Sequence, residues 1–269
     1  MNQYYKDKVV VVTGGTDGIG KSLVEQLLGI GAKVATCGRN HDRLYDLQST
    51  HPSSPLHTMV CDISNEQDCR QFIESTVKVF GTIHVLINNA GISMRGLFKD
   101  METEVLKKVM DINFYGMVYC TKVALPYLIQ EKGVIVGISS VGGYRGLPAR
   151  TGYSASKFAM QGFLECLRVE MMNEDVHVMW VAPGFTSSGI RDRAINEKGE
   201  TQEKNPMDEN KLMSPNEVAA KILKAIKNKK RTLWLSFLTK QTIFMNKFFP
   251  GWTDKLVYKF YFKDKQLVK

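Results

Sequence analysis

The chain has 269 residues, of which 43% are hydrophobic and 23% are charged; these fractions are ordinary for a folded globular protein and exclude a disordered one. Its net charge of +9 is uneven, because residues 231–269 carry eight Lys and Arg against two acidic residues. Such an asymmetry points to an anionic partner, either nucleic acid or a membrane surface.

The five cysteines are odd in number and form no Cys-x-x-Cys pair, which argues against a disulfide framework or a zinc site and favours a reducing compartment. Residues 1–8 are polar and lack the apolar stretch of a signal peptide. The sequence holds no apolar run of about 18 residues, so we expect no membrane-spanning helix. The protein is therefore expected in the cytoplasm, with its basic tail suited to the inner face of a membrane.

Short β-branched runs alternate with longer segments of helical period along the chain. The predicted strands are residues 9–12, 33–37, 56–60, 83–87, 134–138, 176–181 and 232–235. The predicted helices are residues 19–28, 42–47, 66–80, 102–130, 153–172 and 215–227. Continuous apolar strands alternating with helices predict one α/β domain, in which a parallel sheet is covered by helices on both faces.

Two segments depart from this alternation. Residues 187–213 are polar and weakly periodic, and a loop of that length in a compact domain is usually functional or disordered. Residues 236–269 form an aromatic and basic extension of the domain that spans residues 1–235.

A glycine-rich turn follows the first strand and opens the first helix. Its residues Gly14, Gly18 and Gly20 permit a tight turn and close approach of backbone to a pyrophosphate, while Ile19 begins a helix whose N-terminus favours anions. The alternative is a glycine-rich turn that binds nothing. Its position between strand and helix favours dinucleotide binding.

Arg39 follows the second strand, where many dinucleotide folds place an acid for the ribose 2′-hydroxyl. A guanidinium there matches a 2′-phosphate, to which Thr16 can add a hydroxyl, so NADP(H) is the predicted cofactor. The alternative is a solvated arginine at a strand end. Asp17 opposes the prediction, since it places a negative charge in the phosphate-facing turn.

Three further motifs follow in order along the chain. They are Asn88-Asn89-Ala90-Gly91 after the fourth strand, Ser139-Ser140 after the fifth, and Tyr153-Ser154-Ala155-Ser156-Lys157 in the next helix. Together with Thr13-Gly14-x-x-x-Gly18-Ile19-Gly20, this set resembles the short-chain dehydrogenase/reductase family over about residues 8–235. Within that family the pattern is similar to members around 11β-hydroxysteroid dehydrogenase and the ketosphinganine reductases.

Tyr153 and Lys157 are four residues apart on a predicted helix and therefore share a face. A phenol has a pKa of about 10, and lowering it by about 3 needs about 4 kcal/mol of differential interaction. The sequence predicts that the Lys157 ammonium and an oxidised nicotinamide supply this interaction. Tyr153 would then donate a proton to a carbonyl oxygen as hydride arrives at the carbon.

The resemblance implies roles for the residues around this pair. The Ser140 hydroxyl would hold the substrate carbonyl, although Ser139 is adjacent. Asn113 would position a water for a proton relay through Lys157, which would also bind the nicotinamide ribose. Taken singly, each of these residues has an ordinary structural explanation, and it is their joint spacing that favours catalysis.

Further residues are carried over from the same resemblance. Asp62 would hydrogen-bond the adenine amino group, with a helix N-cap as its alternative. Asn89 would lie beside the adenosine. Thr186 would contact the nicotinamide carboxamide, although the family often places this threonine two positions later, where Ser188 stands. Residues 187–213 coincide with the family's substrate lid.

Three explanations compete for the tail: a packing arm or dimer contact, a surface that docks on a bilayer, and nucleic-acid binding. Aromatic residues interleaved with basic ones suit a membrane interface, and no nucleic-acid module accompanies the charge. We therefore expect no nucleic-acid partner. The aromatic residues are Trp234, Phe237, Phe244, Phe248, Phe249, Trp252, Tyr258, Phe260, Tyr261 and Phe262, and the lysines are Lys240, Lys247, Lys255, Lys259 and Lys263.

The complete prediction is a doubly wound Rossmann-type sheet of order 3-2-1-4-5-6-7 that binds NADP(H) at the carboxyl ends of its strands. The predicted reaction is reduction of a hydrophobic, lipid-like or steroid-like ketone to a secondary alcohol, or its reverse. The family implies a homodimer or homotetramer. The alternative function is a non-catalytic NADPH-binding scaffold at a membrane surface, against which the Ser140, Tyr153 and Lys157 set argues.

Overall fold

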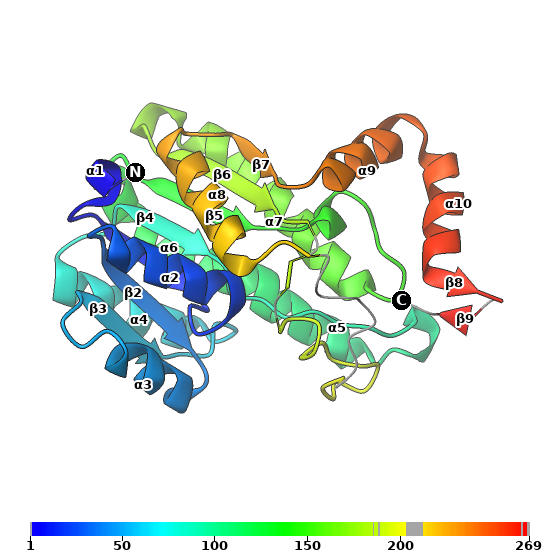
Figure 1. Cartoon of the computed structure of the whole chain (residues 1–269), viewed down its shortest axis with the longest axis horizontal. Helices are drawn as coiled ribbons and strands as arrows, with labels where there is room; N and C mark the ends of the chain where they lie inside the picture. Colours follow the sequence, from blue (N-terminus) through cyan, green and yellow to red (C-terminus); the bar gives the residue numbers. More distant parts are fainter. Residues whose placement is uncertain (1, 185, 188, 203–211, 265, 268–269) are drawn as a thin grey trace.

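A computed structural model describes residues 2–184, 186–187, 189–202, 212–264 and 266–267 of the chain. Its centre is a seven-stranded parallel sheet of order β3-β2-β1-β4-β5-β6-β7, which confirms the predicted order (Figure 1). The strands are β1 (Val9–Thr13), β2 (Lys33–Gly38), β3 (Leu56–Val60), β4 (Val85–Asn88), β5 (Val134–Ile138), β6 (His177–Ala182) and β7 (Thr232–Trp234).

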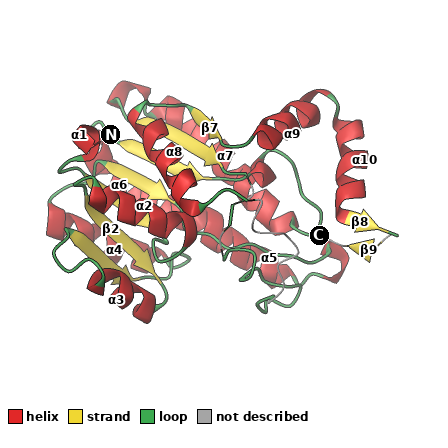
Figure 2. Ribbon diagram, in the orientation of Figure 1, coloured by secondary structure: helices red, strands yellow, loops and turns green. Residues whose placement is uncertain are grey.

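Helices cover both faces of this sheet, as Figure 2 shows. One apolar core joins the sheet to α1, α2 and α8, and a second joins it to α4, α6 and α7. The central strands β1, β4 and β5 are buried at every position, which explains their continuous apolar sequences. These helices are α1 (Asn2–Tyr5), α2 (Gly18–Gly29), α3 (His41–Ser49), α4 (Glu66–Phe80), α6 (Gly116–Gln130), α7 (Thr151–Glu170) and α8 (Pro215–Lys227).

The segment predicted as one helix over residues 102–130 has three parts in the structure. It begins as α5 (Thr103–Met110), passes through a π-helical turn (Asp111–Tyr115) and continues as α6. A π turn inserts one extra residue into the helix and often marks a functional site. Here it contains Asn113, whose side chain is 1% exposed.

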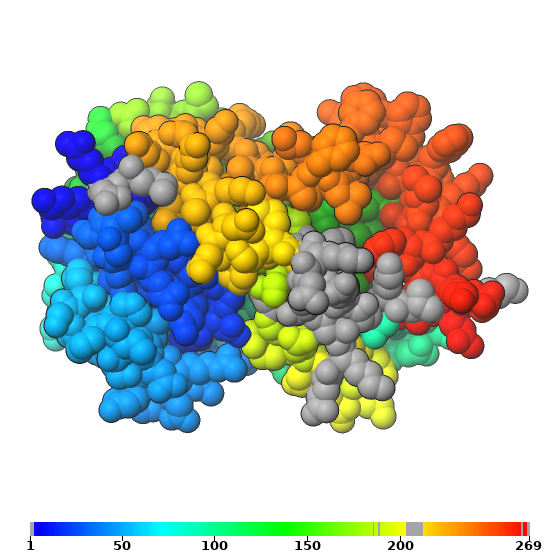
Figure 3. All heavy atoms as spheres, in the orientation of Figure 1, coloured from blue at the N-terminus to red at the C-terminus, as the bar shows by residue number. Residues whose placement is uncertain are grey.

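Beyond β7 the chain forms two further helices, α9 (Phe237–Phe248) and α10 (Pro250–Tyr261), followed by the short strands β8 (Phe262–Lys263) and β9 (Gln266–Leu267). We call α9 and α10 the helical hairpin. It lies beyond the carboxyl ends of the sheet strands, at the end of the molecule opposite α1 to α3 (Figures 1 and 3). Among the described residues, no helix is long and apolar enough to cross a bilayer.

Candidate active site

The predicted site residues meet in one cleft at the carboxyl ends of the strands. The cleft has a volume of about 490 Å³ and passes from the end of β2 to the start of α7. Of the predicted residues, it is lined by Gly14, Thr16, Gly18, Ile19, Gly20, Arg39, Asp62, Asn89, Ser140, Tyr153, Lys157 and Thr186. Asn113 is buried behind it.

The glycine turn is fixed against the end of β4. Gly14 has φ +69°, and a Cβ on it would lie 3.0 Å from the Cα of Ala90. The Nδ2 of Asn89 donates to the carbonyl oxygens of Thr13 and Gly14, both at 3.0 Å. A side chain on Gly20 would overlap the Gly14 carbonyl oxygen. The turn therefore has room only for bare backbone, as phosphate binding requires.

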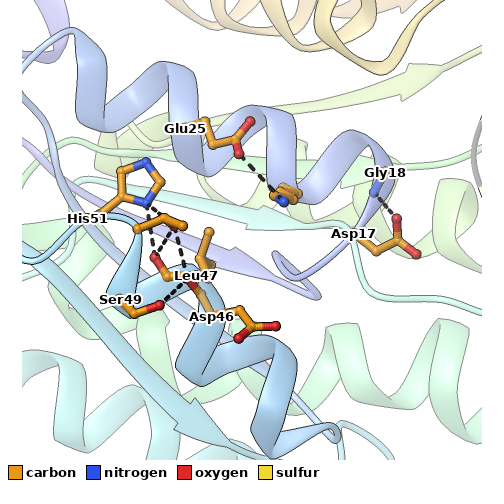
Figure 4. Close-up of polar contacts among 9 residues, drawn as sticks. Asp17, Gly18, Glu25, Asp46, Leu47, Ser49 and His51 are labelled. Carbon is orange, nitrogen blue, oxygen red and sulfur yellow. Dashed lines mark hydrogen bonds and ion pairs between the residues drawn. The ribbon is translucent and has the colours of Figure 1, made fainter.

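Asp17 ends the turn as the N-cap of α2, where its carboxylate accepts from the Gly18 N–H at 2.6 Å (Figure 4). Its other oxygen lies 3.3 Å from Nη1 of Arg43 and 2.5 Å from Nη2 of Arg193. Two guanidinium groups thus offset the negative charge of Asp17, which had argued against a 2′-phosphate beside this turn. Arg43 comes from α3 and Arg193 from the predicted lid.

The end of the cleft beside β2 carries Arg39, Thr16 and Asp62. Arg39 is exposed, and the Thr16 side chain lies against Gly38, so both flank the end of β2. Asp62 accepts from the N–H and hydroxyl of Ser64 at 3.0 and 2.7 Å. Burial acts to raise its pKa, but these bonds and the charge of Arg39 outweigh burial and leave the pKa lowered. Asp62 is not the N-cap of α4, because Asn65 has that role.

The other end of the cleft brings Ser140 and Tyr153 together. Ser140 follows β5, and its Oγ accepts from the Gly142 N–H at 3.1 Å and lies near enough to the Tyr153 phenol to act on its pKa. The Oγ of Ser139 accepts from Gln161 at 2.8 Å. Both serines line the cleft, but only the Ser139 hydroxyl is held by Gln161, and Ser140 is the one that acts on the Tyr153 phenol.

Lys157 is 4% exposed, and its Nζ donates to the carbonyl oxygen of Ile138 at 2.8 Å. The Nζ lies 5.8 Å from the centre of the Tyr153 ring. Burial lowers the pKa of Lys157 to about 8, because an ammonium is poorly solvated inside the protein. Lys157 is thus partly neutral near neutral pH in the protein without cofactor.

The predicted lowering of the Tyr153 pKa by Lys157 and an oxidised nicotinamide stays a prediction, and in the protein by itself a different balance sets this pKa. Burial raises it above its ordinary value of about 10, and the groups that act against burial are Ser140, Arg150 and Arg191 rather than Lys157. The physical reason is that Tyr153 is desolvated, while Lys157 is itself buried and holds its proton weakly. The phenol of the protein by itself therefore keeps its proton at neutral pH.

Asn113 is fully engaged with neighbouring elements. Its Oδ1 accepts from the Ile92 N–H at 2.8 Å, and its Nδ2 donates to the Ile92 carbonyl at 3.0 Å and to Ser156 Oγ at 3.0 Å. Asn113 therefore joins the π turn to the segment after β4 and to α7. This makes it a positioning residue, and its predicted role in a water relay stays a prediction.

Thr186 lies in the cleft wall after β6. Its side chain is 4% exposed and donates to the Gly184 carbonyl at 3.2 Å, while its own carbonyl accepts from Arg191 at 2.6 Å. The alternative Ser188, with Phe185 and residues 203–211 of the predicted lid, lies outside the described residues. The described part of the lid pairs with the body through bridges from Met94 to Ile195 and from Thr186 to Met213.

Four arginines that line the cleft were not among the residues predicted from the sequence. Arg150 and Arg191 act on the pKa of Tyr153, and Arg43 and Arg193 hold Asp17. Arg150 lies only three residues before Tyr153, which is a signal that the sequence does offer. The others lie on α3 and in the irregular lid, where no periodicity shows which way a side chain points.

These features fit a nicotinamide dinucleotide. The bare glycine turn at the start of α2 suits the pyrophosphate, the group of Arg39, Thr16 and Asp62 suits the adenosine half, and Ser140 and Tyr153 lie at the opposite end. Lys157 adds a buried donor beside the last two.

Comparison with known proteins agrees with this geometry. The family model for short chain dehydrogenase matches residues 8–199. The chain is 36% identical over 248 residues to "Dehydrogenase/reductase SDR family member 7B" of Xenopus laevis, covering 87% of this chain and 76% of the relative. It is 38% identical over 187 residues to "11-beta-hydroxysteroid dehydrogenase 1A" of Arabidopsis thaliana, covering 68% of this chain and 53% of that protein.

Among solved structures, a short chain dehydrogenase/reductase from Burkholderia phymatum in complex with NAD superposes with a TM-score of 0.81 at 21% identity, covering 90% of this chain and 94% of that one. This likeness shows the fold. The chain belongs to the short-chain dehydrogenase/reductase family, whose members are oxidoreductases that bind a nicotinamide cofactor.

Proposed function

We propose that the protein is an NADP(H)-dependent carbonyl reductase in which Tyr153 is the acid and Ser140 holds the substrate oxygen. The observation that carries the proposal is that Ser140, Tyr153 and Lys157 line the same cleft as the bare glycine turn. A phenol is protonated at neutral pH, and reduction of a ketone needs that proton.

In the reduction, bound NADPH would supply the hydride to the carbonyl carbon. Ser140 donates a hydrogen bond to the carbonyl oxygen and fixes its position. The O–H bond of Tyr153 breaks as a new O–H bond forms on the substrate oxygen, so that a secondary alcohol leaves and a phenolate remains. Arg150 and Arg191 stabilise that phenolate by their positive charge. The Nζ of Lys157 lies 5.8 Å from the centre of the Tyr153 ring and adds to this when it is protonated.

The preference for NADP(H) over NAD(H) rests on Arg39. No acid follows β2 directly, and the Asp17 carboxylate is held by Arg43 and Arg193. A 2′-phosphate beside Arg39 and Thr16 would therefore meet a guanidinium and a hydroxyl rather than an unpaired carboxylate.

The substrate is proposed to be hydrophobic. Near Tyr153 the cleft is lined by Val141, Leu147 and Ile190 as well as by polar groups. A steroid, a long-chain 3-keto lipid and a small xenobiotic ketone all remain candidates. A homodimer or homotetramer and a cytoplasmic location also stay predictions.

The test is a panel of such ketones with NADPH and with NADH, using the native protein, Tyr153→Phe and the surface control Tyr45→Phe. We expect kcat/KM with NADPH to fall about 10²- to 10⁴-fold in Tyr153→Phe and to be unchanged in the control. NADPH binding should survive in both. No turnover by the native protein, with tight NADPH binding, would favour the scaffold function instead.

A further inference from the structure

The helical hairpin presents large apolar side chains to solvent. Of the eighteen large hydrophobic residues that are exposed in the described chain, ten lie between residues 234 and 260. The most exposed are Phe237 at 81% and Trp252 at 71%. The others are Trp234, Leu238, Phe244, Phe248, Phe249, Leu256, Tyr258 and Phe260. A patch of this size on a monomer marks an interaction site.

Most of the large apolar side chains of the hairpin are exposed, and few are fully buried. In α9 and α10, whose residues are all described, the buried side chains are Thr239, Thr253 and Tyr261. The hydroxyl groups of Thr239 and Ser236 share a hydrogen bond, and the Thr253 hydroxyl donates to the Phe249 carbonyl. Ile243, Met245 and Val257 are half-buried, but the aromatic residues other than Tyr261 face solvent, and this exposed surface suits an apolar partner outside.

Lysines accompany the exposed aromatic residues. Lys240 and Lys247 of α9 and Lys255 and Lys259 of α10 are all exposed, and Lys263 follows them. Two carboxylates oppose these five cations, and one of them, Asp254, is paired with Arg145 at 2.6 Å. On α10, Trp252, Leu256 and Phe260 recur every four residues beside Lys255 and Lys259, so the apolar and basic stripes adjoin.

The hairpin is fixed to the chain segment between Ser140 and Tyr153. Arg145 donates to Asn246 at 2.9 Å and to Asp254, and Asn246 donates back to the Tyr144 carbonyl at 2.9 Å. Arg150, which lines the cleft, donates to the Tyr261 hydroxyl at 3.4 Å. Whatever binds the hairpin is therefore held beside the catalytic end of the cleft.

We propose that the exposed face of α9 and α10 docks on an anionic lipid bilayer. Trp and Tyr side chains with adjacent lysines match a bilayer surface, where the rings enter the headgroup region and the ammonium groups meet anionic lipid. A second copy of the chain fits less well. A two-fold contact through this face would place five lysines against another five, with four carboxylates in all to offset them.

The test is flotation of the purified full chain with vesicles of phosphatidylcholine alone and of phosphatidylcholine mixed with phosphatidylserine, at low and at high salt. We expect retention on the anionic vesicles at low salt and release at high salt. The double variant Phe237→Ser/Trp252→Ser should lose at least about tenfold in partition coefficient, since two large aromatic groups no longer enter the interface. Lys255→Gln/Lys259→Gln should lose about 20-fold on anionic vesicles and little on neutral ones.

The control is Tyr45→Ser on α3, which is 65% exposed at the opposite end of the molecule and should bind like the native chain. Thermal midpoints equal to that of the native chain show that the variants fold. The Trp252 fluorescence, taken as the native spectrum minus that of Trp252→Phe, should shift to the blue with anionic vesicles.

Three outcomes overturn the proposal: a chain that stays in the soluble fraction at low salt, equal binding by the hairpin and Tyr45 variants, or a dimer that Trp252→Ser splits, which would assign the face to a second copy. The proposal is independent of the catalytic one. Tyr153→Phe should bind vesicles like the native chain, so loss of turnover and loss of docking are measured separately.

Discussion

The cleft and the helical hairpin lie at the same end of the molecule, yet they are built in opposite ways. In the cleft, polar groups such as Asn89, Asn113 and Lys157 are largely withdrawn from water and each is hydrogen-bonded. In the hairpin, aromatic groups are exposed and threonines are buried. These polar groups of the cleft thus have hydrogen-bond partners within the protein, whereas the aromatic groups of the hairpin remain available to an apolar partner.

The largest effect should come from the buried cation of the cleft. Because the pKa of Lys157 is about 8 in the folded protein and about 10.4 unfolded, its protonation destabilises the fold by about 3 kcal/mol below pH 8. This cost disappears as the pH rises from about 8 to 10.5, since the unfolded chain binds the extra proton in that window. We therefore expect the free energy of unfolding of the native protein without cofactor, minus that of Lys157→Met, to rise by about 3 kcal/mol between about pH 8 and 10.5. Urea unfolding at a series of pH values measures this difference. A difference that stays flat would mean that Lys157 has an ordinary pKa.

Alanine substitutions at two glycines, one in each region, compare the packing of the cleft with that of the hairpin. A Cβ on Gly20, in the first turn of α2, would overlap the Gly14 carbonyl and lie 2.5 Å from Nδ2 of Asn89, whereas one on Gly251, in the first turn of α10, meets nothing within 4 Å. Gly20→Ala should cost about 1–3 kcal/mol and weaken NADPH binding at least about tenfold. Gly251→Ala should be neutral or stabilise by up to about 1 kcal/mol. Equal costs at the two sites would contradict the contrast in packing.

Arg39 tests the exposed end of the cleft. Arg39→Ala should raise the Kd for NADPH about 10- to 100-fold, because one charged hydrogen-bond partner of the 2′-phosphate is lost. The Kd for NADH should change by less than about threefold. Titration calorimetry with both cofactors measures this, and Arg70→Ala, which removes an exposed guanidinium on α4 outside the cleft lining, serves as the control with both Kd values unchanged. Equal weakening of both cofactors would remove Arg39 from the choice between them.

The smallest effect concerns the attachment of the hairpin. Arg145 is 17% exposed and joins Asp254 and Asn246 to the body, so Arg145→Ala should cost about 1 kcal/mol and speed proteolysis within α9 and α10. The matched control Arg70→Gln removes a pair exposed at 46% and 56% and should change stability by less than about 0.5 kcal/mol. If α9 and α10 of Arg145→Ala resist proteolysis as well as those of the native chain, other contacts hold the hairpin.

Much of the fold and of the site could be predicted from the sequence, because local patterns specify both. Apolar runs give the strands, and β3, β5, α4 and α8 have the predicted bounds. The capping box of Ser214 and Glu217 is present at the start of α8. The glycine turn, Ser140, Tyr153 and Lys157 were predicted from motifs that follow strands of the sheet. They line one cleft because the carboxyl ends of parallel strands meet at one edge.

The tertiary structure decided what depends on distant neighbours. Burial raises the pKa of Tyr153, while Ser140, Arg150 and Arg191 act to lower it, and this balance is a property of the packed site rather than of the four-residue spacing to Lys157. The π turn at Asn113 interrupts a pattern that reads as one helix, and the bond to Ile92 that fixes it comes from another element. The sequence by itself determined that the tail is aromatic and basic. Only the fold showed that these side chains point outward, because burial depends on what the rest of the chain places against a helix.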